Sequence, residues 1–143
     1  MRIKQISIFL ENKPGRLAEV TEILSEGGIN IRALSVADTS DFGVLRLIVD
    51  DSDKAETIMK NNGFTVRKTD VVAVGVSDRP GGLHAILDML LKAGVNVEYL
   101  YAFVHPAGGK AVMIFRFDKI DEAVGKLREN GFKLFDGPEI YGI

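Results

Sequence analysis

The sequence has no cysteine among its 143 residues. Disulfide bonds, thiolate nucleophiles and thiolate metal ligands are therefore excluded. No apolar run approaches the roughly 18 residues of a membrane-spanning helix, and the first residues form a strand pattern rather than a secretory signal. These absences predict a cytoplasmic protein that has no contact with a membrane.

The chain also lacks a large excess of charge of either sign. Its 18 basic and 20 acidic residues give a formal net charge of -2 at pH 7. The basic side chains are scattered and alternate with acids, whereas a nucleic-acid-binding surface collects them into a patch or stripe. We therefore expect no nucleic-acid partner.

Patterns typical of enzymes and of cofactor sites are missing as well. We find no nucleophile accompanied by a base and an orienting residue, and no paired acids at a turn. The two histidines have no metal partner at a recognised spacing. The pairs Gly27-Gly28 and Gly108-Gly109 are not followed by the Lys-Ser/Thr of a phosphate-binding loop. The sequence therefore predicts no enzyme activity, no metal and no cofactor.

What the sequence does contain is one pattern that occurs twice. Asn12-Lys13-Pro14-Gly15-Arg16-Leu17 returns 66 positions later as Asp78-Arg79-Pro80-Gly81-Gly82-Leu83. Gly28-Ile29-Asn30-Ile31 returns at the same spacing as Gly94-Val95-Asn96-Val97. A repeat of this length indicates two small domains, and we predict a first domain over residues 1–69 and a second over residues 70–143.

The periodicity of apolar residues predicts the order strand, helix, strand, strand, helix, strand in each copy. In the first copy the expected elements are strands at 3–10, 30–37, 44–49 and 64–67, with helices beginning at Pro14 and Asp53. In the second copy they are strands at 71–76, 96–104, 111–117 and near 133–135, with helices beginning at Pro80 and Asp118. Residues 68–70 are left as a short linker. This order predicts an α+β fold of two ferredoxin-like βαββαβ modules in tandem, each with an antiparallel four-stranded sheet and both helices on one face.

The strand predicted at 96–104 has apolar residues on both of its faces. One face is expected to hold Val97, Tyr99, Tyr101 and Phe103, and the other Leu100, Ala102 and Val104. A sheet that is apolar on both faces needs cover on both, and a domain of about 70 residues is marginally stable alone. We therefore expect the copies to pack on each other or on another chain, and the protein to be at least a homodimer.

The doubled βαββαβ pattern, with Asn-Lys-Pro-Gly-Arg-Leu in its first turn and Gly-Ile-Asn-Ile before its second strand, resembles the ACT domain. That family is named for regulatory domains of aspartate kinase, chorismate mutase and prephenate dehydrogenase. The second copy resembles it as well, so the resemblance extends over essentially the whole chain. It implies a regulatory protein that binds a small effector, most often an amino acid, at an interface between paired ACT domains. The implied partner is a regulated enzyme or transporter.

Carried over by position, the resemblance implies a ligand site in each copy: Asn12, Lys13, Pro14, Gly15, Arg16, Leu17 and Asn30 in the first, and Asp78, Arg79, Gly81, Gly82 and Asn96 in the second. The free N–H groups of a helix start favour a carboxylate, and a glycine there admits a close approach. An asparagine side chain both donates and accepts hydrogen bonds. We expect Asn30 to lie close to the turn after the first strand and to hold the ligand ammonium. The first copy is favoured, because Asp78 places a negative charge where a ligand carboxylate would bind.

Each of these residues also has a purely structural interpretation. A Pro-Gly pair starts a helix after a strand, and the two asparagines can satisfy the glycine turn before a strand. The alternative function is therefore an assembly or dimerisation module that binds no ligand. Leu10 and Val76 occupy a strand-end position where some serine-binding ACT domains have a histidine, which argues against serine as the effector by that route.

Overall fold

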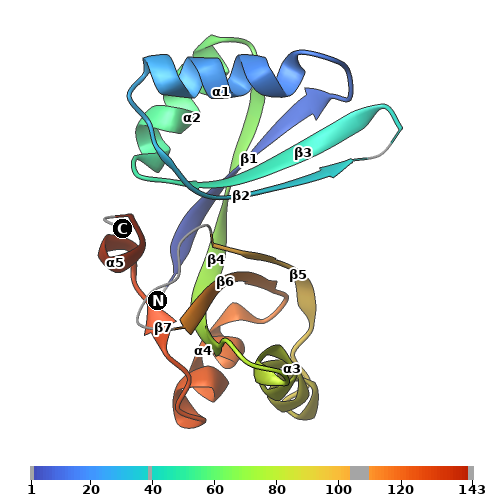
Figure 1. The fold of residues 1–143 in the computed structure, drawn as a ribbon, viewed down its shortest axis with the longest axis vertical. Helices are drawn as coiled ribbons and strands as arrows, with labels where there is room; N and C mark the ends of the chain where they lie inside the picture. Colours follow the sequence, from blue (N-terminus) through green and yellow to red (C-terminus); the bar gives the residue numbers. More distant parts are fainter. Residues whose placement is uncertain (1, 39, 104–109, 142–143) are drawn as a thin grey trace. The chain divides into compact units, whose positions relative to one another are not determined.

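A computed structural model describes residues 2–38, 40–103 and 110–141 of the protein. The predicted strand end at Val104 and the pair Gly108-Gly109 lie outside the described residues. The chain divides into two compact units, one made of residues 4–69 and the other of residues 70–141 together with the first residues of the chain (Figure 1). Within the described part, no helix is long and apolar enough to span a membrane.

The first unit has the predicted order of elements: β1 (Ile3–Glu11), α1 (Arg16–Glu26), β2 (Ile31–Asp38), β3 (Phe42–Val49), α2 (Ser52–Asn61) and the beginning of β4 (Thr65–Ser77). Its strands lie in the order β2-β3-β1-β4. Strand β3 is antiparallel to both β1 and β2, so β1 and β2 run in the same direction and β2 forms an edge of the sheet.

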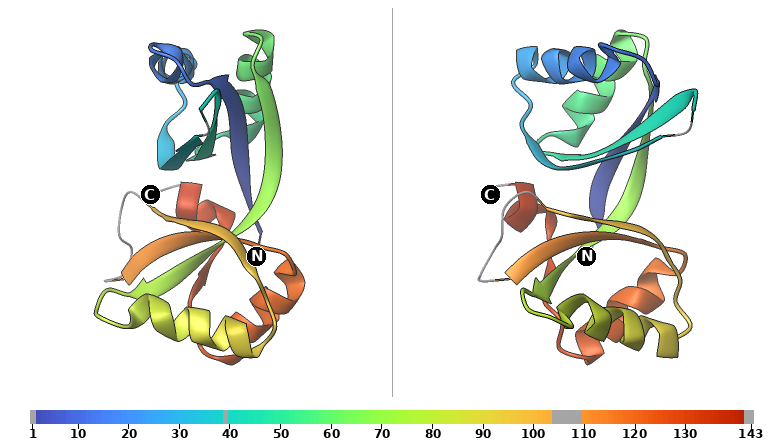
Figure 2. Two further views of the ribbon diagram at one scale, coloured as in Figure 1. Left: turned by 90° about the vertical axis from the view of Figure 1, so that its right-hand side faces the viewer. Right: turned by 45° about the vertical axis from the view of Figure 1, so that its right-hand side comes forward.

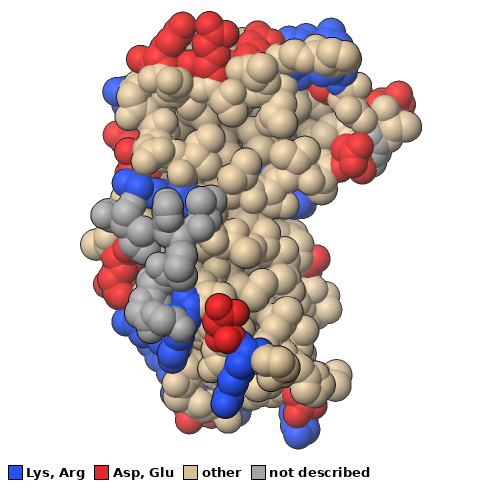
Figure 3. All heavy atoms as spheres, viewed as in Figure 1, with Lys and Arg blue, Asp and Glu red and all other residues tan. Residues whose placement is uncertain are grey.

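The core of the first unit lies between the sheet and its two helices. Val20 and Leu24 of α1 and Ala55 and Met59 of α2 are buried against a row of apolar strand residues that includes Ile6, Ile8, Leu45 and Leu47. Figure 2 shows both helices on one face of the strands. The opposite side of α1 is rich in glutamate, and Figure 3 shows acidic side chains grouped over it. Helix α1 is therefore amphipathic, with its apolar face on the sheet.

The second unit repeats the arrangement with the remainder of β4, followed by α3 (Gly82–Lys92), β5 (Val97–Ala102), β6 (Lys110–Phe117), α4 (Ile120–Glu129), β7 (Leu134–Phe135) and a short helix, α5 (Gly137–Tyr141). Its strands lie in the order β5-β6-β4-β7, and each pair is antiparallel. Phe115 and Phe117 stack at 5.4 Å between ring centroids in its core. The α+β class with tandem ferredoxin-like modules is confirmed.

Three details of the predicted elements are wrong. The helices predicted to begin at Pro14 and Pro80 begin at Arg16 and Gly82, because the glycine after each proline is left-handed and not helical. The residues assigned to a linker, 68–70, belong to one strand that continues from the first unit into the second, because the β-branched residues around them favour an extended backbone and no glycine or proline interrupts it. A register shift between Val97 and Tyr99 turns Val97 to the face of Phe117 rather than to that of Tyr101. Packing of the copies on each other or on another chain stays a prediction.

Candidate ligand-binding site

The predicted ligand turn lies between β1 and α1 and is open to solvent. Asn12, Lys13, Pro14 and Gly15 are all exposed. Gly15 precedes α1 in a left-handed conformation with φ 87°, and because glycine has no side chain it cannot cap the helix. Within the described residues, the N–H groups of the next two helical positions after Arg16 donate no hydrogen bond. The turn therefore offers donors that suit a carboxylate.

The turn lies beside the far end of the edge strand β2. The Asn12 side-chain amide donates to the Asp38 carboxylate at 3.3 Å, and the Asn12 backbone N–H donates to the carbonyl of Asp41 at 2.9 Å. Both contacts place the end of β2 and the hairpin after it next to the start of α1. Leu17, on the first turn of α1, is 41% exposed.

Asn30 does not lie near this turn, and that expectation was wrong. It precedes β2, where its backbone N–H donates to the Asp50 carboxylate at 3.0 Å and its carbonyl accepts from the Asp50 N–H at 3.2 Å. Since β2 has eight residues, the turn and Asn30 are separated by the length of the strand, roughly 25 Å at about 3.3 Å per residue. A strand-helix-strand crossover causes this, because the helix returns the chain to the starting end of the sheet.

In the second copy the glycine before the helix has the same conformation, but the residues around it differ. Gly81 repeats the left-handed conformation with φ 86°, and Asp78 is exposed. Gly82 is buried, and a Cβ atom there would lie 2.0 Å from the carbonyl oxygen of Ser77. Asn96 is held by Asp118 as Asn30 is held by Asp50, with backbone bonds of 3.0 and 3.2 Å. The two predicted halves of this site are also at opposite ends of the sheet.

A groove of about 390 Å³ adjoins Asn30. Its other walls come from the C-terminal half of α1 and the connection to β2: Thr21, Leu24, Ser25, Gly28, Ile29 and Ile31. Asn30 is exposed, and its side-chain amide makes no hydrogen bond within the described part of the chain. It therefore has donors and an acceptor to offer to a ligand.

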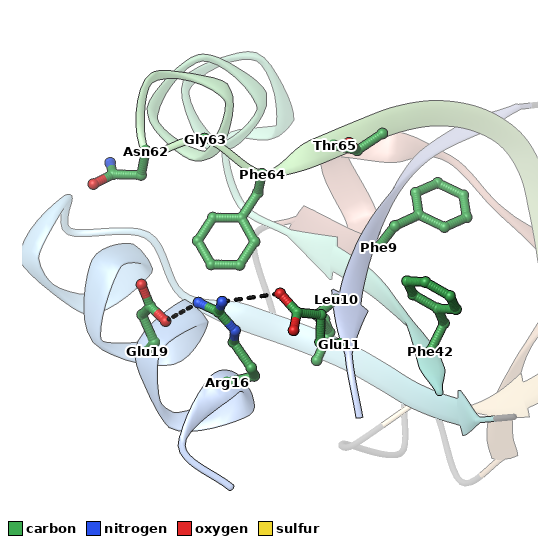
Figure 4. A pocket seen from close by; sticks show the side chains of 10 residues that line it. All are labelled: Phe9, Leu10, Glu11, Arg16, Glu19, Phe42, Asn62, Gly63, Phe64 and Thr65. Carbon is green, nitrogen blue, oxygen red and sulfur yellow. Dashed lines mark hydrogen bonds and ion pairs between the residues drawn. The ribbon is translucent and has the colours of Figure 1, made fainter. Parts of the chain in front are cut away.

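A second cavity, of about 240 Å³, lies on the other side of α1, toward the turn between α2 and β4 (Figure 4). It is lined by Phe9, Leu10, Glu11, Arg16, Glu19, Phe42, Asn62, Gly63, Phe64 and Thr65. Of the predicted site residues, only Arg16 is among them. Apart from Glu19 on α1, sequence reasoning missed the others because they come from β1, β3, the α2–β4 turn and the start of β4, which only the tertiary fold brings together.

Charged side chains form a connected network in this cavity. Arg16 binds Glu19 at 3.0 Å and Glu11 at 3.1 Å. Lys13, which does not line the cavity, also contacts Glu11 at 3.1 Å. Hydrogen bonds from Lys13 and then from Arg16 lower the pKa of Glu11 below its ordinary value. Glu11 therefore stays ionised at neutral pH. Within the described ranges, no group of three or more side chains is suited to bind a metal ion.

Comparisons with known proteins agree with this geometry. The chain is 42% identical to protein BT0572 from Bacteroides thetaiotaomicron, with a TM-score of 0.93, over 100% of this chain and 98% of that one. The regulatory subunit of aspartate kinase from Thermus thermophilus has the same fold at 17% identity, with a TM-score of 0.62 over 90% of this chain and 92% of that one. The corresponding subunit from Thermus flavus has a TM-score of 0.61 at 17% identity, covering 88% and 90%. A comparison with curated proteins gave no match.

The family comparison covers nearly the whole sequence. Residues 1–138 match the family model described as an ACT domain pair. The doubled turn motif and the two βαββαβ units each agree with that match. The chain therefore belongs to the ACT domain family.

Proposed function

We propose that this protein is a cytoplasmic regulator that binds an amino acid between two ACT modules paired along their β2 edges. The chain contributes two such modules, residues 1–69 and 70–143. The effector is held by the turn after β1 of one module and by the asparagine before β2 of the module from another copy. A regulated enzyme or transporter then responds to the change in pairing.

One observation supports this arrangement above all: the two halves of the predicted site lie at opposite ends of the same module. Both β1 and β2 run in one direction, with the turn at Asn12 beside the end of β2 and Asn30 before its start. Pairing β2 with the β2 strand of a second copy by a two-fold axis makes the strands antiparallel. The start of each β2 then lies next to the end of the other, which brings Asn30 of one copy to the turn of its neighbour.

The edge strand has the surface that such pairing needs. Leu34 and Val36 of β2 are 44% and 49% exposed, and they alternate along the strand on one face. An edge strand with unpaired backbone groups and exposed apolar side chains favours addition of another strand. The groove beside Asn30 opens next to this edge and would be closed by the second copy.

The two halves are chemically complementary to the two charges of an amino acid. The N–H groups at the start of α1 suit its carboxylate, and the Asn30 carbonyl oxygen suits its ammonium. A ligand that contacts both copies binds the paired state more tightly than the separate state, so it shifts the equilibrium toward pairing. This is a regulatory role, and it needs no catalytic group.

A panel of the twenty amino acids tests this function by thermal unfolding. An effector at 100 times its dissociation constant should stabilise the protein by about 2.7 kcal/mol. Asn30→Ala should weaken binding by about ten-fold to a hundred-fold, since hydrogen bonds to charged groups contribute about 1.5 to 3 kcal/mol. Asn96→Ala is the matched variant in the second copy, and weaker binding by it would show that Asn96 contacts the effector. If no amino acid stabilises the protein, the alternative of an assembly module without a ligand is correct.

A further inference from the structure

We propose that the face of the first sheet turned away from α1 and α2 binds a mononucleotide, with its base on the exposed rings of Phe9 and Phe42 and its phosphate on Arg67. This open face is made by β1, β3 and the first residues of β4. It lies on the opposite side of the sheet from the N–H groups of α1 that are proposed to bind the effector. The nucleotide is therefore a second ligand, and the proposal does not depend on the proposed function.

The strands place the three side chains on one face. The residues just before Phe9 and Arg67 belong to the core under the helices, so Phe9 and Arg67 point to the other face. Phe42 pairs with Glu11, two residues after Phe9, and therefore lies on the face of Phe9. Figure 4 shows the two rings next to each other, on the side of β1 away from Arg16. Phe9 and Phe42 thus form one aromatic surface across the two central strands of the unit.

This aromatic surface is open to solvent. Phe9 and Phe42 are 38% and 63% exposed. A ligand that covers them removes apolar area from water, which favours binding. The flat face of a nucleobase suits such rings, and a four-stranded sheet with aromatic residues on its open face is one of the common platforms on which bases stack.

Arg67 supplies the group that a phosphate needs. Its guanidinium carbon lies 6.0 Å from the centre of the Phe9 ring, and the side chain is exposed. Among the residues that the structure describes, Arg67 makes no hydrogen bond and no ion pair. An arginine held beside a ring without an acidic partner can donate two parallel hydrogen bonds to a phosphate.

The other charges that the strands turn to this face also favour an anion. Arg46 pairs with Ser7 across β3 and β1 and points to the same face. Glu11 points to it as well, but its carboxylate is bound by Lys13 and Arg16. The face therefore has more positive than negative charge. This excess suits a single phosphate group, whereas a nucleic acid strand needs an extended basic surface, which the sequence lacks.

In the second module the corresponding face is covered by the chain itself. Gly75 occupies the position of Phe9, and Phe135 occupies that of Arg67. Phe135 is 7% exposed, and a Cβ atom on Gly75 would lie 3.4 Å from its ring. Lys133, two residues before Phe135, forms an ion pair of 3.1 Å with α5, which places that helix beside this face. Open rings with an unpaired arginine are therefore specific to the first module.

The test uses the full chain in calorimetric titrations with three probes: adenosine monophosphate (AMP), adenosine, which lacks the phosphate, and ribose 5-phosphate, which lacks the base. We expect AMP to bind. Adenosine should bind at least about ten-fold more weakly, because it lacks the hydrogen bonds to a charged group. Ribose 5-phosphate should bind at least about five-fold more weakly, because it lacks base stacking.

Two variants assign the two halves of the site. Phe42→Ala should weaken AMP binding at least about five-fold and leave ribose 5-phosphate unchanged. Arg67→Gln should weaken AMP binding at least about ten-fold and leave adenosine unchanged. Arg128→Gln is the matched control, since Arg128 is exposed on α4 of the other unit, and it should bind AMP as the parent does. Asn30→Ala should also bind AMP normally.

Several results would overturn the proposal. They are failure of AMP to bind at millimolar concentration, and equal affinity of AMP for the parent, Phe42→Ala and Arg67→Gln. If a short oligodeoxythymidine bound through Phe42 while AMP did not, the ligand would be a single strand instead. If Phe42→Ala turned a dimer into a monomer in sedimentation, a second copy would cover the face. Binding of AMP without binding of any amino acid would support this site and contradict only the proposed function.

Discussion

At the scale of single residues, the position after the left-handed glycine distinguishes the two copies. In the first copy it is Arg16, whose side chain lines a cavity and binds two carboxylates. In the second it is Gly82, which brings α3 against the end of β4. One backbone path therefore produces an open site in one module and a packed contact in the other.

Replacing these two residues by alanine should have very different effects. In Gly82→Ala the new methyl group would collide with the carbonyl of Ser77, and overpacking of this kind costs about 1 to 3 kcal/mol. Arg16→Ala removes only surface ion pairs, which contribute about 0 to 1 kcal/mol. Urea unfolding followed by circular dichroism measures both. Equal midpoints for the two variants would show that the close contact at Gly82 does not restrict the side chain.

The same scale shows what sequence reasoning finds and what it misses. The two Pro-Gly turns lie where the sequence predicts each first helix to start, because Pro-Gly interrupts a strand locally. The helices themselves begin two residues later than predicted, at Arg16 and Gly82, after a left-handed glycine. Asn30 was wrongly expected to lie close to the turn at Asn12. The helix between β1 and β2 makes the two strands parallel, so the end of β1 and the start of β2 lie at opposite ends of the sheet. The cavity was not predicted, because Phe9, Phe42 and Phe64 are distant in sequence and each resembles an ordinary core residue.

At the scale of elements, the edge strand β2 is the feature on which assembly depends. Its two exposed apolar residues, Leu34 and Val36, are what strand pairing would bury. The order of elements was predictable because glycines and prolines separate segments of clear periodicity. The continuity of strand β4 was not predictable, because residues 68–70 are polar and resemble a linker although their backbone is extended.

A charge on the edge strand should prevent pairing. Leu34→Lys places an ammonium group in the proposed interface, and charged residues on edge strands oppose the addition of another strand. We expect a monomer of this variant in sedimentation at a concentration where the parent is a dimer. Leu91→Lys is the control, since Leu91 is 76% exposed on α3, away from any strand edge. Dissociation by Leu91→Lys but not by Leu34→Lys would place the interface on α3 instead.

At the scale of the whole molecule, two modules with one fold differ in the chemistry of their turns. The first has Asn12 and Arg16 in its turn, where the second has Asp78 and Gly82. The relationship to protein BT0572 from Bacteroides thetaiotaomicron extends over the full length of this chain, so the doubled arrangement is shared as a unit. In the proposed arrangement two copies complete each site at the β2 edge, which would link effector binding to assembly.

The central claim is that each effector site takes its turn from one copy and its asparagine from another. Two variants disable one half each. Asn30→Ala removes the acceptor, and Leu17→Asp puts a carboxylate at the start of α1, where it suits the helix but repels the carboxylate of the ligand. Each variant alone should bind the effector at least about ten-fold more weakly than the parent.

The most direct measurement is a calorimetric titration of the two variants after they have been mixed and allowed to exchange subunits. A mixed dimer has one site with both halves damaged and one site with both halves intact, so about a quarter of all sites should regain the parent affinity in an equal mixture. Asn96→Ala mixed with Leu17→Asp shows whether the asparagine comes instead from the second module of the other copy. If the mixture of Asn30→Ala and Leu17→Asp regained no tight sites, the effector site would not combine the turn of one copy with Asn30 of another, and the account would be contradicted.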